Sequence, residues 1–231
     1  TELKTEATRS MKMYTSTFTI DTDGKVLDLG TVNNVPMRIK TTLVDVNGEH
    51  FTEATSTVTL TDHVAYKNPD TDKTYTLTGT LYVKYGDALT EMMTETVDFQ
   101  PTETSGTQDV TFTFDASELV GKSVVAFEEL SVNGEFCAEH KDKDDENQTV
   151  TFPGIQTTAR DNVTEDHVSN ATDSITIVDT VAYTGLKKGD TYTVIGTLMD
   201  AETGEAALDD DGNAITASKE FTAPSTDGNI D

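Results

Sequence analysis

Short segments in which apolar and polar residues alternate recur along the chain, and most are bounded by Gly, Asn, Asp or Pro. Alternation with a period of two is typical of β-strands that bury one face. A complete unit of about 116 residues is predicted to hold the strands 37–44, 57–66, 74–84, 109–114, 123–130, 136–140 and 148–152. DASELVG at 115–121 is either one helical turn or a loop. Seven short strands favour an all-β, Ig-like sandwich.

An internal repeat sets the predicted domain organisation. Segments separated by 116 or 117 residues match in three places: IKTTLVD (39–45) with IQTTARD (155–161), ATSTVTLTDHVAY (54–66) with ATDSITIVDTVAY (171–183), and TYTLTGTL (74–81) with TYTVIGTL (191–198). We therefore predict tandem Ig-like repeats, one complete at 35–152 and a second at 153–231 that lacks a counterpart of 110–152. Residues 1–34 are predicted to form an N-terminal β segment or the tail of a preceding unit.

Composition narrows the function classes. The net charge of -26 argues against nucleic acid and against anionic membrane surfaces as partners. The sequence shows no apolar run long enough to span a membrane and no sorting signal. A single cysteine rules out an internal disulfide, so any cross-link must use other chemistry. The 44 threonines favour strands over helices.

Polar residues interrupt the inward, apolar rows of the predicted strands. They are Thr41, Asp62, Glu128, His140 and Gln148, and two recur in the second repeat as Thr157 and Asp179. Burying an unpaired polar group costs a few kcal/mol, and a lone buried charge costs more. The five side chains of the first repeat are therefore expected to meet one another rather than lie scattered through the core.

Together these five groups could carry out acyl transfer. A histidine can take the proton from a threonine hydroxyl, which can then attack the carbonyl carbon of a glutamine side chain. A protonated carboxyl can stabilise the oxyanion. Loss of ammonia would leave a Thr–Gln ester after a single turnover, so we expect no enzyme, no cofactor and no metal.

The segments VVAFEEL (124–130), AEHKDKDDENQTV (138–150), IKTTLVD (39–45) and TDHVAY (61–66) carry a specific resemblance. In this order they resemble the ester-cross-linked Ig-like (CnaB-like) repeats of Gram-positive surface adhesins, often called VaFE repeats. The resemblance covers 35–152 in full and 153–231 in part. It implies a structural stalk repeat of an extracellular, cell wall-anchored protein whose anchor lies outside this sequence. Its partners would be neighbouring repeats and, as an open question, a host surface ligand.

The resemblance also implies a role for each residue. Thr41 would be the nucleophile and Gln148 the acyl partner, His140 would activate the threonine, and Asp62 and Glu128 would form the acid pair at the carbonyl. Asp145 matches an acidic position of the family and would orient His140, although a solvated loop acid is an equally good interpretation. The second repeat keeps Thr157 and Asp179 but contains no Glu, His or Gln partner, so we expect that it cannot cross-link itself.

The hairpin after Glu128 poses a problem of register. A two-residue Asn133–Gly134 turn would place Phe127, not Glu128, opposite His140. We therefore predict a three-residue loop, 133–135, that restores the pairing of Glu128 with His140.

Other functions remain open from the sequence alone. A ligand-binding adhesin module could use the acidic segments 21–24, 141–147 and 209–213, whose Asp spacing loosely resembles calcium loops. An isopeptide cross-link would need a lysine on an inward row, and the first repeat shows none. A hydrolase could use Cys137 and His140, but a separation of three places them on opposite faces of a strand.

Overall fold

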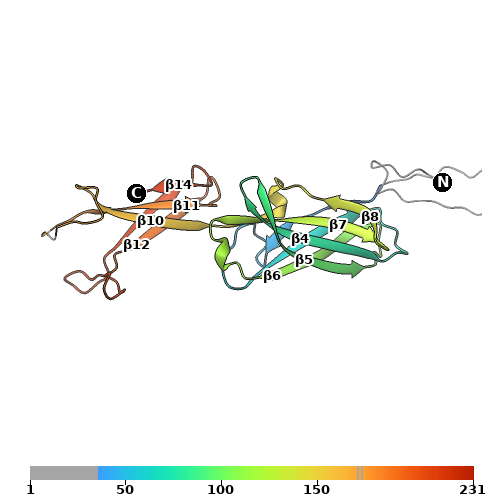
Figure 1. The fold of residues 1–231 in the computed structure, drawn as a ribbon, viewed down its shortest axis with the longest axis horizontal. Coiled ribbons are helices and arrows are strands. Elements are labelled where there is room, and N and C mark those ends of the chain that lie inside the picture. The colour runs from blue at the N-terminus through green and yellow to red at the C-terminus, as the bar shows by residue number, and fades with distance from the viewer. Residues whose placement is uncertain (1–35, 171, 173) are drawn as a thin grey trace, which may run out of the picture. The chain divides into compact units, whose positions relative to one another are not determined.

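The chain folds into two compact units in a computed structural model that describes residues 36–170, 172 and 174–231 (Figure 1). The first unit extends to residue 151, and the second comprises Phe152–Asp231 together with Leu119–Lys122. The predicted segment 1–34 and its acidic loop at 21–24 lie outside the described residues.

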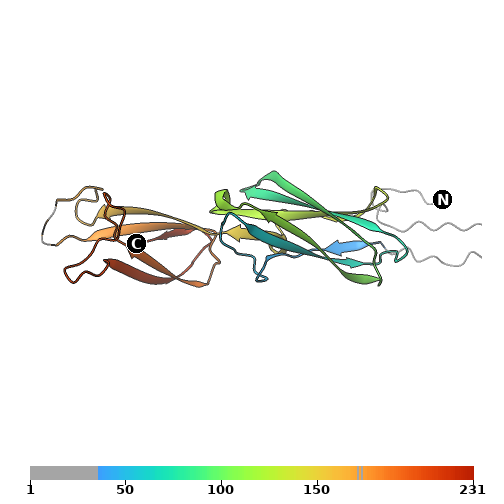
Figure 2. The ribbon, with the colours of Figure 1, turned by 90° about the horizontal axis from the view of Figure 1, so that it is seen from below.

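The first unit is a sandwich of two antiparallel sheets (Figure 2). One sheet contains β1 (Arg38–Lys40), β2 (Leu43–Asp45), β3 (Val58–Lys67) and β6 (Ser105–Phe114), with β3 paired to all the others. The other contains β5 (Ala88–Phe99), β4 (Tyr75–Tyr85), β7 (Lys122–Val132) and β8 (Glu135–His140), with β9 (Thr149–Phe152) paired to β7. This arrangement confirms the predicted all-β sandwich.

The core lies between the inward rows of these sheets. Alternate residues of β3 and β4 are buried, as the sequence pattern requires for strands with one solvated face. Fully buried apolar residues come from both sheets and include Leu43, Leu60, Phe112, Leu77, Leu81 and Leu130. The polar residues on inward rows are therefore surrounded by closely packed apolar side chains.

Three elements differ from the prediction. The strand β5 was not predicted, because its residues are mostly exposed and its polar and apolar positions alternate poorly. The predicted first strand is divided into β1 and β2, and the gap falls at Thr41 and Thr42. A one-turn 3-10 helix, η2 (Ser117–Leu119), occupies the DASELVG segment, and a second, η3 (Glu146–Gln148), replaces the predicted start of the last strand.

The β7–β8 hairpin corrects the predicted three-residue loop. Its turn has two residues, Asn133 and Gly134, both with positive φ (51° and 75°), and β7 resumes pairing at once through Val132 and Glu135. The register then shifts, because Leu130 pairs with Ala138 and Cys137 is left as the extra residue of a bulge. Glu128 is thereby paired with His140, as expected, although the extra residue lies in the strand and not in the turn.

The second unit contains two sheets. One consists of β10 (Gly154–Asp161), β11 (Ile177–Thr184) and β14 (Gly228–Ile230), and it repeats the first sheet of the first unit in the same register. The other consists of β12 (Thr191–Thr197) and β13 (Thr216–Thr222). Ile155 pairs with Tyr183 as Ile39 pairs with Tyr66, and Ala159 pairs with Asp179 as Leu43 pairs with Asp62. The internal repeat in the sequence is thus a repeat in strand pairing.

Apolar positions that are buried in the first unit are exposed in the second. Leu60 and Leu81 are completely buried, whereas their counterparts Ile177 and Leu198 are 43% and 39% exposed. Among the described strands, β12 pairs only with β13, while its counterpart β4 pairs with both β5 and β7. The second unit therefore has a thinner core and an edge strand where the first unit has a central one.

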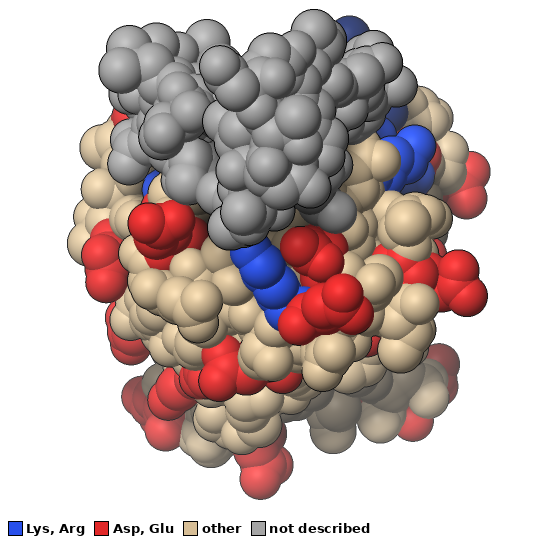
Figure 3. Space-filling model, turned by 90° about the vertical axis from the view of Figure 1, so that its right-hand side faces the viewer, with Lys and Arg blue, Asp and Glu red and all other residues tan. Residues whose placement is uncertain are grey.

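Acidic side chains are scattered over the visible face of the molecule and do not form a single patch (Figure 3). Among the described residues, no helix is long and apolar enough to cross a membrane.

Hydrogen exchange should detect the difference between the edge strand β12 and the central strand β4. We expect the β12 amides to exchange about ten-fold or more faster than the matching β4 amides, because β12 has one strand neighbour and a thinner core. Amide exchange followed by mass spectrometry would compare 192–197 with 75–80 in the same sample. Equal protection of the two strands would contradict the described edge.

Candidate functional site

The predicted nucleophile and acyl partner touch. Gln148 ends the η3 turn, and its Nε2 donates a hydrogen bond of 2.7 Å to Thr41 Oγ1, which lies in the gap between β1 and β2. Both side chains have zero exposure. A second, longer contact of 3.5 Å joins Gln148 Nε2 to the backbone carbonyl of His140. The Thr41 hydroxyl oxygen is therefore held against the carboxamide in a site closed to solvent.

Two carboxyl groups lie on inward rows of the facing sheets. Asp62 is on β3 and Glu128 is on β7, and neither is exposed. No donor of a described residue is aligned on any of their four oxygens. Two adjacent buried carboxylates without donors would be very unfavourable, so the pair must hold at least one proton.

The pKa values of the pair point in the same direction. Burial, followed by the hydrogen bond and the charge of Asp62, raises the pKa of Glu128 to about 10. Burial also raises the pKa of Asp62; Glu128, the Thr42 amide and the Thr41 hydroxyl lie near enough to oppose the rise, although none is aligned for a hydrogen bond to its oxygens. At neutral pH the pair therefore holds a proton, and a protonated carboxyl group lies inside the core as a hydrogen-bond donor.

The histidine and the loop acid also meet. His140 Nε2 lies 3.3 Å from Asp145 Oδ2, and the other ring nitrogen, Nδ1, is buried without a hydrogen-bond partner among the described residues. A carboxylate at Nε2 favours the tautomer with its proton on that atom, which leaves Nδ1 as the basic nitrogen. Burial raises the pKa of Asp145, but hydrogen bonds from Asn147 and the charge of His140 outweigh it, so this pKa is lowered. Asp145 is thus a partly buried carboxylate beside the ring.

The loop between β8 and β9 is anchored by residues that the sequence reasoning missed. Lys84, on β4, donates from Nζ to the backbone carbonyl of Lys143 at 2.7 Å and to the Asp144 carboxylate at 3.2 Å. Lys143 in turn binds Asp87 in the β4–β5 turn at 2.9 Å. These contacts fix the segment that carries Asp145 and Gln148. No sequence signal identifies them, because they join β4 and the β4–β5 turn to a loop nearly sixty residues later in the chain.

The second unit brings fewer of these groups together. Thr157, on β10, is exposed, whereas Asp179, on β11, is half-buried with Oδ1 inaccessible and unpaired. The residues that would correspond to Glu128, His140 and Gln148 belong to the segment 110–152, which the second repeat does not match. A different histidine, His167, lies with its Nδ1 2.7 Å from the carbonyl oxygen of Ala159, the residue that pairs with Asp179.

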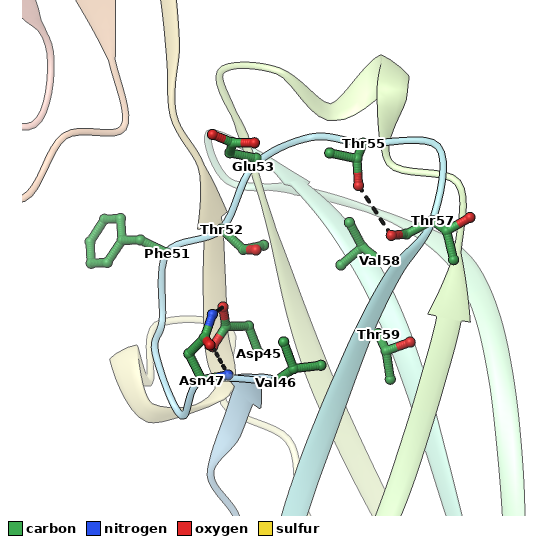
Figure 4. Close-up of a pocket in the computed structure, with 10 residues that line it drawn as sticks. All are labelled: Asp45, Val46, Asn47, Phe51, Thr52, Glu53, Thr55, Thr57, Val58 and Thr59. Atoms are coloured by element: carbon green, nitrogen blue, oxygen red, sulfur yellow. Dashed lines mark hydrogen bonds between the residues drawn. The ribbon is translucent and has the colours of Figure 1, made fainter.

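A groove of about 500 Å³ lies at the end of β2, away from the paired side chains (Figure 4). Asp45, Glu53 and Thr59 are among its lining residues, and none of the predicted site residues is. The Asp45 carboxylate already accepts hydrogen bonds from the Asn47 backbone, the Asn47 side chain and the Glu49 backbone. The carboxylate that lines the groove is thus already hydrogen-bonded within its own loop.

The alternative sites gain no support from the described residues. There, no group of three or more His, Cys, Asp or Glu side chains could hold a metal ion. In the acidic segment 209–213, Asp209 accepts backbone hydrogen bonds from Asp211 and Asn213, and in 141–147 the carboxylates of Asp142 and Asp145 do the same within their loop. The thiol of the bulged Cys137 donates to the Glu135 carbonyl.

Comparison with known proteins identifies the family. The model of the T-Q ester bond containing domain matches residues 37–152 and again residues 153–231. The chain belongs to this family. The resemblance found in the sequence is thereby confirmed, and both repeats are members. A search of curated proteins finds no match.

Two solved structures are similar to this chain. Both are of a bacterial adhesin from Mobiluncus mulieris that contains intramolecular disulfide, isopeptide and ester bond cross-links, in two crystal forms. Each is 14% identical to this chain. One match covers 82% of this chain and 95% of the other with a TM-score of 0.49, and the second covers 81% and 99% with a TM-score of 0.51. At this identity the second likeness shows the fold alone.

The buried acid pair predicts an unusual pH dependence for the protein without its cross-link. In a Thr41→Ala background, the folded pKa of Glu128, about 10, lies above the ordinary value of 4.5. Its contribution to stability is therefore complete below pH 4.5 and is lost as the pH rises towards 10. Urea denaturation between pH 4 and 9 should show a falling midpoint, and Glu128→Gln should flatten this dependence.

Glu129→Gln is the matched control, because Glu129 is the next residue on β7 and pairs with Lys141 at the surface. A midpoint that rises with pH in the Thr41→Ala protein, or an equal slope in the Glu128→Gln variant, would contradict a protonated pair.

Proposed function

We propose that the first unit is a stalk repeat of a bacterial surface adhesin that closes itself with an ester bond between Thr41 and Gln148. The observation that carries this proposal is the 2.7 Å contact between the Thr41 hydroxyl oxygen and the Gln148 carboxamide inside a fully buried site. Membership of the T-Q ester bond family supports it.

The surrounding groups supply the acid and the base of the reaction. His140 Nδ1 takes the hydroxyl proton, and Thr41 Oγ1 attacks the side-chain carbonyl carbon of Gln148. The proton held by Glu128 and Asp62 stabilises the negative charge that develops on Gln148 Oε1, which is buried and has no other aligned donor among the described residues.

The tetrahedral intermediate then collapses with cleavage of the C–N bond. The protonated His140 returns its proton to the leaving nitrogen, which departs as ammonia, and the ester remains. Asp145 stabilises the imidazolium that forms in between. The reaction occurs once per chain, so the protein has no substrate and no turnover and is not an enzyme in the usual sense.

The bond would alter stability and mechanics. It joins side chains 107 residues apart in sequence. In the chain-entropy treatment of cross-links, closing a loop of roughly 100 residues stabilises the folded state by about 4–5 kcal/mol. Tension applied to the first strand would pass through the ester to β9 and would not separate the strands in between.

An extracellular location on a Gram-positive cell wall follows from this function. The Mobiluncus mulieris protein of the same fold is an adhesin with ester cross-links. An acidic, threonine-rich surface and a single cysteine suit a protein outside the cell that replaces disulfides with other covalent bonds. Neighbouring repeats of the same chain are the proposed partners.

Intact mass is the direct test of the ester. Formation of the bond should leave the purified protein about 17 Da lighter than its sequence mass, because one ammonia is lost. Thr41→Ala and Gln148→Ala should each restore the full sequence mass of the variant. Thr42→Ala, which changes the less buried neighbour of Thr41, should keep the loss. An unchanged mass in the wild-type protein would exclude the proposed reaction.

Thermal unfolding measures what the bond contributes. Thr41→Ala should lower the Tm by on the order of 20 °C, because about 4–5 kcal/mol of loop entropy returns to the unfolded state. Thr42→Ala should shift it by only a few degrees. Equal Tm values for the two variants would show that the bond does not stabilise the unit.

Force spectroscopy tests the mechanical role. Pulled through its ends, the first unit of the wild-type chain should show no unfolding step for residues 42–147, because the ester carries the load. Thr41→Ala should release the segment between the two positions, which are 107 residues apart in sequence, or about 350 Å of extended chain. A step of that length in protein whose mass proves the ester would contradict the proposed load path.

A further inference from the structure

A glycine occupies an inward position in the middle of β4. Gly79 pairs with Glu95 on one side and with Glu128 on the other, so it lies in a strand with neighbours at both edges. Its inward neighbours along the strand, Leu77 and Leu81, are fully buried. Glycine is unfavourable in such a position, and the backbone of Gly79 has no positive φ that would require it. Another cause must therefore account for this glycine.

The space above Gly79 is filled by the carboxyl group of Glu128. A Cβ added at Gly79 would lie 2.7 Å from Glu128 Oε1 and 2.9 Å from Oε2, closer than such atoms approach in proteins. It would also lie 2.8 Å from Phe112 Cζ. Glu128 and Phe112 are both completely buried, so neither side chain can swing into solvent to make room.

The same glycine recurs in the second unit without this crowding. Gly196 stands in TYTVIGTL where Gly79 stands in TYTLTGTL. The nearest atom to a Cβ at Gly196 is the Ala217 carbonyl oxygen at 4.0 Å, so an alanine would fit there. The glycine thus accompanies the threonine and aspartate that the two repeats share, Thr157 and Asp179, rather than a local need of β12.

We propose that Gly79 is a positioning residue of the ester-forming site, and that it determines that the acid at position 128 is a glutamate. Its missing side chain forms the seat that holds the Glu128 carboxyl between β4 and Asp62. An alanine would displace the carboxyl from Asp62 and from the carbonyl of Gln148. This inference rests on the proposed ester reaction.

A pair of substitutions tests the seat. Gly79→Ala should slow the loss of ammonia at least ten-fold, measured by intact mass over time in protein made by cell-free synthesis and incubated at pH 7. Glu128→Asp alone should also slow it, because the carboxyl is withdrawn by one methylene. The double variant Gly79→Ala/Glu128→Asp should react faster than either single variant, because the shorter acid fits above the alanine. Thr78→Ala, at the outward neighbour, should react like the wild type.

Measurements of stability test the contact between Gly79 and Glu128 independently of the ester reaction. In a Gln148→Ala background, where no ester can form, Gly79→Ala should lower the urea midpoint, and Glu128→Ala should restore part of the loss by removing one of the two side chains that the new Cβ meets, the other being Phe112. If the wild-type protein never loses ammonia, the ester proposal fails, while this comparison still tests the contact. A Gly79→Ala protein that cross-links at the wild-type rate, or single effects that combine without interaction in the double variant, would overturn the role of Gly79.

Discussion

Two carboxyl groups buried against each other are the constraint on which the first unit depends. Asp62 and Glu128 have no exposure and no aligned donor from another described residue, so the fold is tenable only while the pair keeps a proton. The same proton is the one that the proposed reaction needs at the carbonyl of Gln148. A buried acid pair that would destabilise an ordinary sandwich core thus supplies the proton for the proposed reaction.

Strand register brings the remaining groups to this pair. Glu128 faces His140 only because the bulge at Cys137 shifts the pairing of β8 by one residue after a two-residue turn. A slip of one residue would move the histidine to the outer face, since side chains alternate across a strand. On the opposite sheet, the pairing of Leu43 with Asp62 sets Thr41 two residues earlier on the same inward row. Register is therefore as much a part of the site as the side chains are.

The alternation of polar and apolar residues predicted much of this arrangement. Thr41, Asp62, Glu128 and Gln148 were placed on inward rows from the sequence, and all four are fully buried. The period of two is a geometric property of any strand, so it needs no knowledge of the fold. It failed for β5, which is exposed along most of its length and has no apolar row to detect.

The alternation of polar and apolar residues could not predict contacts between distant segments. The bulge that replaces the predicted three-residue loop, the η3 turn under Gln148 and the anchoring of the 141–148 loop by Lys84 depend on how loops meet in space. In the sequence, the only sign of the seat at Gly79 is that a glycine recurs at position 196. The reason for the glycine is evident only when the structure places the Glu128 carboxyl above it. Sequence periodicity thus identifies which groups are buried, and tertiary structure identifies what holds them.

The proposed bond lies close in sequence to the start of the second repeat. Gln148 directly precedes β9, a single proline separates β9 from β10, and Thr157 lies nine residues after Gln148. In the proposed cross-linked state, tension would cross the first unit at Thr41 and Gln148 and continue along β9 and β10. Residues 42–147 would lie outside that path, so their hydrogen bonds would bear none of the load. Because both side chains are fully buried, water would reach the proposed ester only if the unit opened, and the bond itself would oppose that opening.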